Sequence, residues 1–310
     1  MNKIPNRQII CEELMRAVEK DKSIVVLASD SRGSASMAPF AEAFPDNFVE
    51  VGIAEQNLIG IAAGMAACGK KAFVTSPACF VSMRSAEQVK VDMAYSNTNV
   101  KLVGISGGIS YGALGMSHHS VQDLAIMRAI PNMTVIIPAD RFETQGMVKA
   151  LLSHVGPTYI RVGRNPVQDV YEEIPDFVIG KAKEICSGED LSLIACGETV
   201  AFAKEAAAQL EAEGISVEVI NMHTLKPLDK EAILRTAKKT GKVITIEEHS
   251  IYNGLGAAVA EVIVQEHPVP MKILGIPDEP AIAGTSTEVY AHYGLDAQGI
   301  IKEVKSMLTR

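Results

Sequence analysis

The chain has 310 residues, which is enough for two domains that each bury a full hydrophobic core. Hydrophobic residues make up 47%, aromatic residues only 5%, and the net charge is −8 without any Trp, so a nucleic-acid-binding surface is excluded. There is no signal peptide, no apolar run of membrane-spanning length and no CxxC pair among five scattered cysteines, so we expect a cytoplasmic protein with reduced thiols.

The first half of the chain alternates between strand-like and helix-like segments. Strands are predicted at 24–28, 72–75, 101–105 and 134–137, and helices near 8–20, 54–68, 80–96, 120–129 and 141–153. Continuous β-branched runs separated by helices predict a parallel sheet that is covered on both faces. Proline, glycine and polar residues interrupt this pattern near 165–190, which predicts a linker.

A second α/β set follows the linker. Strands are predicted at 191–195, 217–220, 243–246 and 272–274, and helices near 199–213, 229–239, 255–266 and 296–308. The fold class is therefore α/β, with two doubly wound domains over residues 1–175 and 176–310.

Glu55 opens a helix that directly follows an apolar strand beginning at Phe48. Nothing charged follows it until Lys70, and a helix that is apolar all round is a buried one. A lone carboxylate is costly to ionise there unless another group shares its proton. The alternative is an acidic residue in the first turn that the helix dipole favours.

A glycine-bearing loop over 112–119 ends in two histidines, His118 and His119. We expect Ser120 to cap the next helix, with Asp123 as its capping-box partner. Loops at the carboxyl ends of parallel strands bind ligands, and a histidine there can contact a hydroxyl group or move a proton. Ordinary loop histidines are the alternative, and a metal pair is the weakest option.

These segments resemble the pyrimidine-binding domain of transketolases and other thiamine diphosphate enzymes. The resemblance implies that Glu55 bonds the aminopyrimidine of the cofactor and shares the proton that activates the thiazolium carbon. His118 matches the histidine that contacts the reacting sugar, and His119 lies beside it as in 1-deoxyxylulose-5-phosphate synthases. The implied fold is a parallel-sheet pyrimidine-binding domain, followed by a transketolase C-terminal domain with a mixed sheet.

Further cofactor contacts follow from the same resemblance. Phe80 matches the aromatic residue that stacks on the aminopyrimidine, although a core Phe is the alternative. Asp30 and Met83 are also expected at the cofactor. Ala78 and Met83 stand where the family commonly has further aromatic residues, so the pocket is expected to be reshaped.

Three residues match the phosphate-binding positions of transketolases. Arg164 follows a strand and matches the arginine that holds the substrate phosphate, for which a planar guanidinium is well suited. Arg7 and Ser34 match two more such positions. Surface arginines and turn serines are common, which is the alternative for all three.

Two departures bear on the substrate. Leu114 stands where transketolases usually have an acidic residue, and Ser106 where they have a histidine. A less hydroxylated, branched or otherwise modified sugar phosphate would tolerate both changes better than a standard pentose phosphate.

Two further segments are interpreted as structural. Pro138 and Asp140 are expected to form a turn and a helix cap. Glu247, Glu248 and His249 end a strand, and because neighbouring side chains of a strand point to opposite faces, we interpret them as interface or turn residues, not as a metal site.

The diphosphate-binding part of a transketolase is missing, because Gly-Asp-Gly occurs nowhere in the chain. The resemblance therefore implies the second subunit of a split transketolase. A separately encoded partner would carry Gly-Asp-Gly and bind Mg²⁺ or Ca²⁺, and thiamine diphosphate would be shared between the chains. No metal site is expected here, and leftover apolar surface predicts a two-plus-two assembly.

The expected function is the transfer of a two-carbon ketol unit between sugar phosphates, with Glu55 and His118 as catalytic residues. The enzyme alternatives are a 1-deoxyxylulose-5-phosphate synthase-like protein or the β-subunit of a 2-oxo acid dehydrogenase. A regulatory or scaffolding subunit that kept the fold is the alternative without catalysis. Neither a membrane nor a nucleic acid is expected as a partner.

Overall fold

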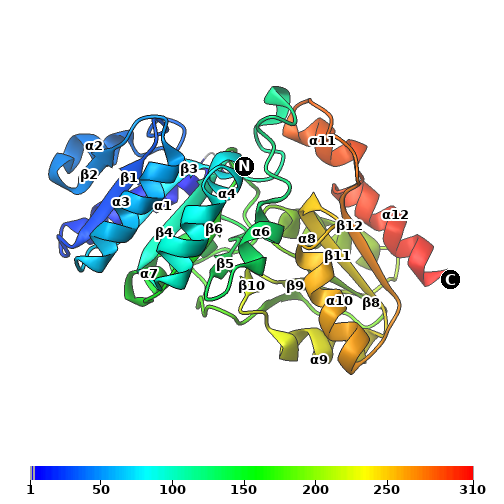
Figure 1. The fold of residues 1–310 in the computed structure, drawn as a ribbon. Coiled ribbons are helices and arrows are strands. Elements are labelled where there is room, and N and C mark those ends of the chain that lie inside the picture. The colour runs from blue at the N-terminus through cyan, green and yellow to red at the C-terminus, as the bar shows by residue number, and fades with distance from the viewer. Residues whose placement is uncertain (1, 3, 310) are drawn as a thin grey trace.

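A computed structural model describes residues 2 and 4–309, which form two mainly parallel sheets with helices packed on their faces (Figure 1). The seven-stranded sheet has the order β10-β5-β6-β4-β3-β1-β2, and the five-stranded sheet has the order β12-β11-β8-β9-β7. The strands of the first are β1 Ile24–Ala28, β2 Phe48–Glu50, β3 Lys71–Pro77, β4 Val100–Ile105, β5 Thr134–Ile136, β6 Thr158–Arg161 and β10 Thr224–Lys226. Those of the second are β7 Lys183–Cys186, β8 Leu191–Ala195, β9 Val217–Asn221, β11 Val243–Ser250 and β12 Met271–Ile276.

Each sheet contains one antiparallel pair at an edge. Strand β10 pairs antiparallel with β5, so a segment from the C-terminal half completes the first sheet. Strand β7 pairs antiparallel with β9, which confirms the mixed second sheet and shows that part of the predicted linker is a strand. The α/β fold class with two such units is confirmed, whereas the boundary between residues 175 and 176 stays a prediction.

Helices cover both faces of each sheet, because successive side chains of a strand point alternately to its two faces. On the first sheet, Val25 and Leu27 pack toward α3, while Ile24 and Val26 pack toward α1 and α7. One apolar cluster continues from α3 through β5 to α9 and α10, so both halves share a core. The helices of the first half are α1 Asn6–Val18, α2 Ala38–Ala43, η1 Pro45–Asn47, α3 Glu55–Ala67, α4 Ala78–Met83, α5 Ala86–Gln88, η2 Val89–Tyr95, η3 Gly112–Leu114, α6 Asp123–Ala129 and α7 Arg141–Ser153. Those of the second are α8 Thr199–Glu211, α9 Lys230–Thr240, α10 Leu255–Glu266, α11 Ser286–His292 and α12 Ala297–Leu308.

The predicted helix caps have different outcomes. Asp140 caps α7 by accepting a hydrogen bond of 2.8 Å from the Glu143 amide, as predicted. The prediction that Ser120 and Asp123 form a capping box is wrong, because Ser120 forms an isolated β-bridge with Gly108 and α6 begins only at Asp123. The Asp123 carboxylate instead accepts a hydrogen bond of 2.6 Å from the Tyr159 hydroxyl.

The helix predicted near 80–96 is broken into three pieces, α4, α5 and the π-helix η2. The break lies at Ser85, whose hydroxyl donates to the Val81 carbonyl at 2.8 Å. A serine hydroxyl that bonds the preceding turn offers the backbone an alternative to the regular helix. This break leaves Met83 and Arg84 at the end of α4.

The two halves are joined by a buried ion pair. The Arg161 guanidinium donates to the Glu248 backbone carbonyl at 2.6 Å and to its carboxylate at 3.2 Å, and lies 3.6 Å from Asp123. Burial by itself would lower the pKa of Arg161, but the charges of Asp123 and Glu248 raise it above its ordinary value. Gly108 lies against this pair at φ +59°, and a Cβ there would overlap with both side chains.

The residues that flank Glu248 point elsewhere. The Glu247 carboxylate accepts from the amides of Leu255 and Gly256 at 2.7 and 2.8 Å, which caps α10. The Ala125 amide donates to His249 Nε2 at 3.3 Å across the interface. The interpretation of this segment as interface and turn structure is confirmed.

Lys101 gives a prediction for the stability of the first sheet. Its buried ammonium donates to Asn99 Oδ1 and to the Gly156 carbonyl, both at 2.7 Å, and burial followed by the charge of Lys71 lowers its pKa to about 7. Between about pH 7 and the unfolded value of 10.5, the unfolded chain binds the extra proton, so this group makes stability rise with pH. We expect Lys101→Met to abolish this dependence, whose slope in that window is roughly 1.4 kcal/mol per pH unit.

The measurement is denaturant unfolding of both proteins at pH 7.5, 8.5 and 9.5. The unfolding free energy of the wild type minus that of the variant should rise steadily with pH. A difference that stays constant from pH 7.5 to 9.5 would show that Lys101 is charged in the folded chain.

Candidate functional site

The carboxyl ends of β1, β3, β4 and β6 lie at one edge of the first sheet, where open α/β sheets bind ligands. Glu55 begins α3 next to this edge, and only 2% of it is exposed. Its carboxylate Oε2 lies 2.7 Å from Nη1 of Arg84, which follows α4. This pairing offsets part of the cost of burying the carboxylate.

Phe80 and His118 extend the site away from Glu55. The Arg84 guanidinium lies over the Phe80 ring, with its Cζ 4.9 Å from the ring centroid. The His118 ring meets Phe80 edge to face, at 5.5 Å between centroids. The Ser117 hydroxyl lies 3.0 Å from His118 Nδ1 and holds the orientation of the imidazole.

Tyr111 connects His118 to the predicted phosphate-binding arginine. Its ring lies 5.3 Å from the His118 ring in an edge-to-face arrangement, and the Arg164 guanidinium lies 5.2 Å from its centroid. Arginine stacks well on aromatic faces because its guanidinium is planar and weakly hydrated. Tyr111 therefore holds the imidazole and the guanidinium next to each other.

Two arginines meet at the far end of the site. Arg7 Nε donates to the Arg164 carbonyl at 3.1 Å, and Arg7 Nη1 donates to the Ser34 carbonyl. Burial, followed by the neighbouring charge of Arg164, lowers the pKa of Arg7. Among the described residues, neither guanidinium forms an ion pair with a carboxylate. Two adjacent unpaired guanidinium groups suit a phosphate.

Contacts thus connect most of the predicted site residues in one line, which we call the site row. Sequence reasoning missed two of its members, Arg84 and Tyr111. Arg84 carries a signal, because it is the only charged residue from Ala72 to Ala86; Tyr111 carries none. The members of the site row are Glu55, Arg84, Phe80, His118, Tyr111, Arg164, Arg7 and Ser34.

Three predicted residues lie outside the site row. The buried His119 ring bonds the Gly112 carbonyl at 3.0 Å, and burial lowers its pKa, so it braces the loop instead of extending into the site. Asp30 follows β1 and is exposed, and its amide donates to Glu50 at 2.6 Å. Met83 is exposed and directly precedes Arg84.

The two positions that depart from the transketolase pattern lie in the same region. Ser106 follows β4 with its hydroxyl buried, and that hydroxyl has no partner among the described residues. Leu114 ends η3 and is exposed. The loop that carries it packs against the segment before α11, since a Cβ at Gly112 would approach the Gly284 carbonyl. Neither position offers an ionised group to a substrate.

A planar, nitrogen-rich ring fits the Glu55 end of the site row. The buried Glu55 carboxylate provides a hydrogen-bond acceptor, and the half-buried Phe80 ring provides a stacking surface. The two lie close enough together that Arg84 contacts both. Within residues 2 and 4–309, no cluster of three or more His, Cys, Asp or Glu side chains could hold a metal ion. In the same residues, no helix is long and apolar enough to cross a bilayer.

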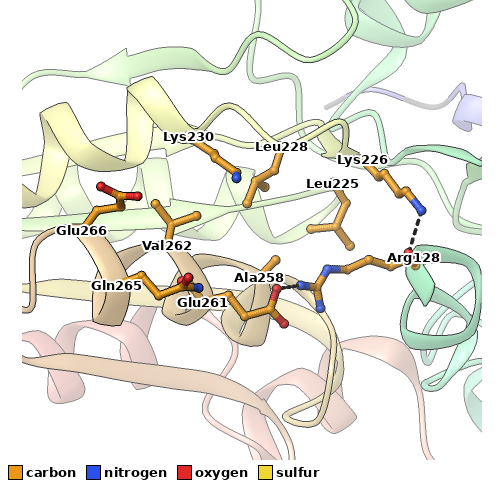
Figure 2. A pocket seen from close by; sticks show the side chains of 10 residues that line it. All are labelled: Arg128, Leu225, Lys226, Leu228, Lys230, Ala258, Glu261, Val262, Gln265 and Glu266. Atoms are coloured by element: carbon orange, nitrogen blue, oxygen red, sulfur yellow. Dashed lines mark hydrogen bonds and ion pairs between the residues drawn. The ribbon is translucent and has the colours of Figure 1, made fainter. Parts of the chain in front are cut away.

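A separate cleft of about 320 Å³ lies between β10, α9 and α10 (Figure 2). Two of its three cationic groups are engaged by the chain itself: Arg128 pairs with Glu261, and Lys226 Nζ donates to the carbonyls of Arg128 and Ile130 at 3.0 and 2.6 Å. None of its ten lining residues belongs to the site row. We therefore do not assign the chemistry to this cleft.

Comparisons with known proteins agree with this arrangement. Residues 2–169 match the family model "Transketolase, pyrimidine binding domain", and residues 180–300 match "Transketolase, C-terminal domain". The chain is 49% identical to one of the subunits of the apulose-4-phosphate transketolase of Phocaeicola vulgatus, over 97% of this chain and 96% of that one. It is 39% identical to the 6-deoxy-6-sulfo-D-fructose transketolase subunit SqwH of a Clostridium species, over 98% and 94%. A solved split gene transketolase, described as an inactive β4 tetramer, superimposes with a TM-score of 0.92 at 38% identity, covering 99% of each chain.

Proposed function

Since the chain belongs to the transketolase family, we propose that it is the second subunit of a split, thiamine diphosphate-dependent transketolase. It transfers a two-carbon ketol unit between sugar phosphates. The observation that carries this proposal is the site row, in which a buried carboxylate, a histidine and two unpaired arginines follow one another in contact. The relatives that are named as transketolase subunits support the same function.

Each member of the site row has a proposed role. Thiamine diphosphate, when bound, supplies the carbon that carries the two-carbon unit. Glu55 holds the proton of the aminopyrimidine, and Phe80 stacks on that ring, with Asp30 and Met83 at the edge of the cofactor site. His118 orients the reacting hydroxyl or carbonyl group. Arg164, Arg7 and Ser34 hold the substrate phosphate.

A separately encoded partner is proposed to complete the site. It would carry Gly-Asp-Gly, bind the diphosphate and a Mg²⁺ or Ca²⁺ ion, and form a cytoplasmic heterotetramer with two copies of each chain. Exposed apolar side chains support association, because Ile53, two residues before Glu55, is 75% exposed and Tyr95, at the end of η2, is 83% exposed. The related split transketolase that is described as inactive is a tetramer of one kind of chain, which supports the need for a partner.

Apulose 4-phosphate is the proposed donor substrate. A relative that is 49% identical over nearly its whole length is named for this sugar phosphate. Leu114 and Ser106 support a donor that differs from the common pentose phosphates, because they lack the acidic and imidazole groups of the standard pattern. The more distant relative, named for a sulfonated fructose, makes that sugar the second donor to test.

The test is co-expression with the proposed Gly-Asp-Gly-bearing subunit and an assay of ketol transfer to glyceraldehyde 3-phosphate. Apulose 4-phosphate, 6-deoxy-6-sulfofructose, xylulose 5-phosphate and pyruvate are offered as donors, with each subunit alone as the control. We expect turnover of apulose 4-phosphate by the pair and none by either chain alone. Turnover of pyruvate without turnover of any ketose derivative would reject the proposal in favour of the 2-oxo acid alternatives.

Arg164 gives a prediction about phosphate recognition. A charge-assisted hydrogen bond contributes about 1.5–3 kcal/mol, so Arg164→Ala should raise the KM for glyceraldehyde 3-phosphate roughly 10- to 100-fold. The KM for unphosphorylated glyceraldehyde should change little. Arg235→Ala, on the exposed face of α9, is the matched control and should leave both values unchanged. Equal changes for the two acceptors would assign Arg164 a structural role instead.

A further inference from the structure

Arg84 contacts both of the residues that are proposed to hold the aminopyrimidine. Its Nη1 lies 2.7 Å from the Glu55 carboxylate, and its Cζ lies 4.9 Å from the centroid of the Phe80 ring. It follows the last residue of α4, and 48% of its side chain is exposed, whereas the Glu55 side chain is almost fully buried. A single, accessible cation thus occupies the acceptor and one ring face at this end of the site row.

The chemistry of these two contacts matches that of an aminopyrimidine. A guanidinium is flat, donates N–H groups in its plane and stacks on aromatic rings. An aminopyrimidine is also flat, offers a hydrogen-bond partner to a carboxylate and stacks on a phenyl ring. Both groups therefore compete for the same carboxylate and the same ring.

The burial of the two partners determines which of them can leave. Without a partner, the Glu55 carboxylate would be buried and unsatisfied, which is costly. Arg84 already lies half in water, so its guanidinium can return to solvent at a small cost. The pair is stable in the cofactor-free chain and separable when another donor arrives.

We infer that Arg84 holds the place of the aminopyrimidine in the cofactor-free chain and must release Glu55 and Phe80 when thiamine diphosphate binds. This inference rests on the proposed function, because it takes Glu55 and Phe80 as the cofactor's ligands. It makes Arg84 a determinant of cofactor affinity: the measured affinity is reduced by the fraction of molecules in which Arg84 is in place.

The test is a calorimetric titration of thiamine diphosphate with Mg²⁺ into the two-subunit complex. Arg84→Met removes the competing cation and should lower the Kd roughly three- to tenfold. Arg84→Lys keeps a charge near Glu55 but stacks less well, so its Kd should lie between those of wild type and Arg84→Met. Lys90→Met, which removes an exposed cation from the neighbouring η2, controls for the general attraction of the diphosphate and should not lower the Kd.

A second readout uses the chain without cofactor. Arg84→Met should lower its melting temperature measurably, because Glu55 loses its partner, while Lys90→Met should not. A Kd that is unchanged or raised in Arg84→Met overturns the inference, and a raised Kd would make Arg84 a ligand of the bound cofactor. If wild-type complex binds no thiamine diphosphate at all, the proposed function itself fails.

Discussion

In the proposed complex with a partner subunit, Glu55→Gln is expected to lower kcat by about 10²- to 10⁴-fold, the range for removal of a general acid–base group. The amide keeps the size of the side chain but cannot share a proton with the aminopyrimidine. Because Glu55 lies at the first position of α3 and its partner Arg84 is half exposed, the fold should survive the change. The measurement is steady-state ketol transfer, with the melting temperature as a check on folding.

Glu87→Gln is the matched control, since Glu87 is an exposed carboxylate in the nearby α5. It should leave kcat unchanged. Glu55→Asp is expected to be strongly impaired as well, because the shorter side chain withdraws the carboxylate from its partner. Full activity of the Glu55→Gln complex would support the alternative of a regulatory or scaffolding subunit.

The largest effect on stability is expected for Arg161→Met. The substitution leaves the buried Glu248 carboxylate without its cation and Asp123 without a nearby one, and breaking a buried ion pair in this way costs about 3–5 kcal/mol. We expect a melting temperature lower by roughly 10 °C. Lys181→Met, which removes the exposed pair with Glu231, is the control and should leave the melting temperature nearly unchanged.

The pH dependence of the Arg161→Met variant provides an independent check. Burial already raises the pKa of Glu248 above its ordinary value of 4.5, and loss of Arg161 should raise it further. A carboxyl group whose folded pKa is raised stabilises the chain below its unfolded pKa, and this stabilisation is lost as pH rises through the folded pKa. The deficit of the variant should therefore be smaller at pH 5 than at pH 8. Adding Glu248→Gln should recover part of the loss at pH 8, and an equal deficit at both pH values would contradict the buried-charge explanation.

The amino-acid sequence by itself determined the α/β class and most of the elements, and the family resemblance implied the mixed second sheet, although β7, the strand that makes it mixed, fell in the predicted linker. The helices at 141–153 and 255–266 agree with α7 and α10 in both bounds, because apolar periodicity and a local cap such as Asp140 define them. The motif residues Glu55, Phe80, His118, Arg164 and Arg7 were also identified from the sequence, and all of them lie in the site row.

Only the tertiary structure decided where side chains far apart in the sequence meet. Asp123 looked like the partner of a local cap, yet it turns toward Tyr159 and Arg161, because these buried polar groups of β6 provide stronger partners than a cap. The strand β10 is only three residues long and forms an edge of the first sheet by pairing with β5. A segment this short shows no periodicity in the sequence that could indicate it. The contact of Arg84 with Glu55 likewise joins residues 29 positions apart. Local patterns encode elements and their caps, whereas charge pairing in a buried interior depends on which strands the chain brings together.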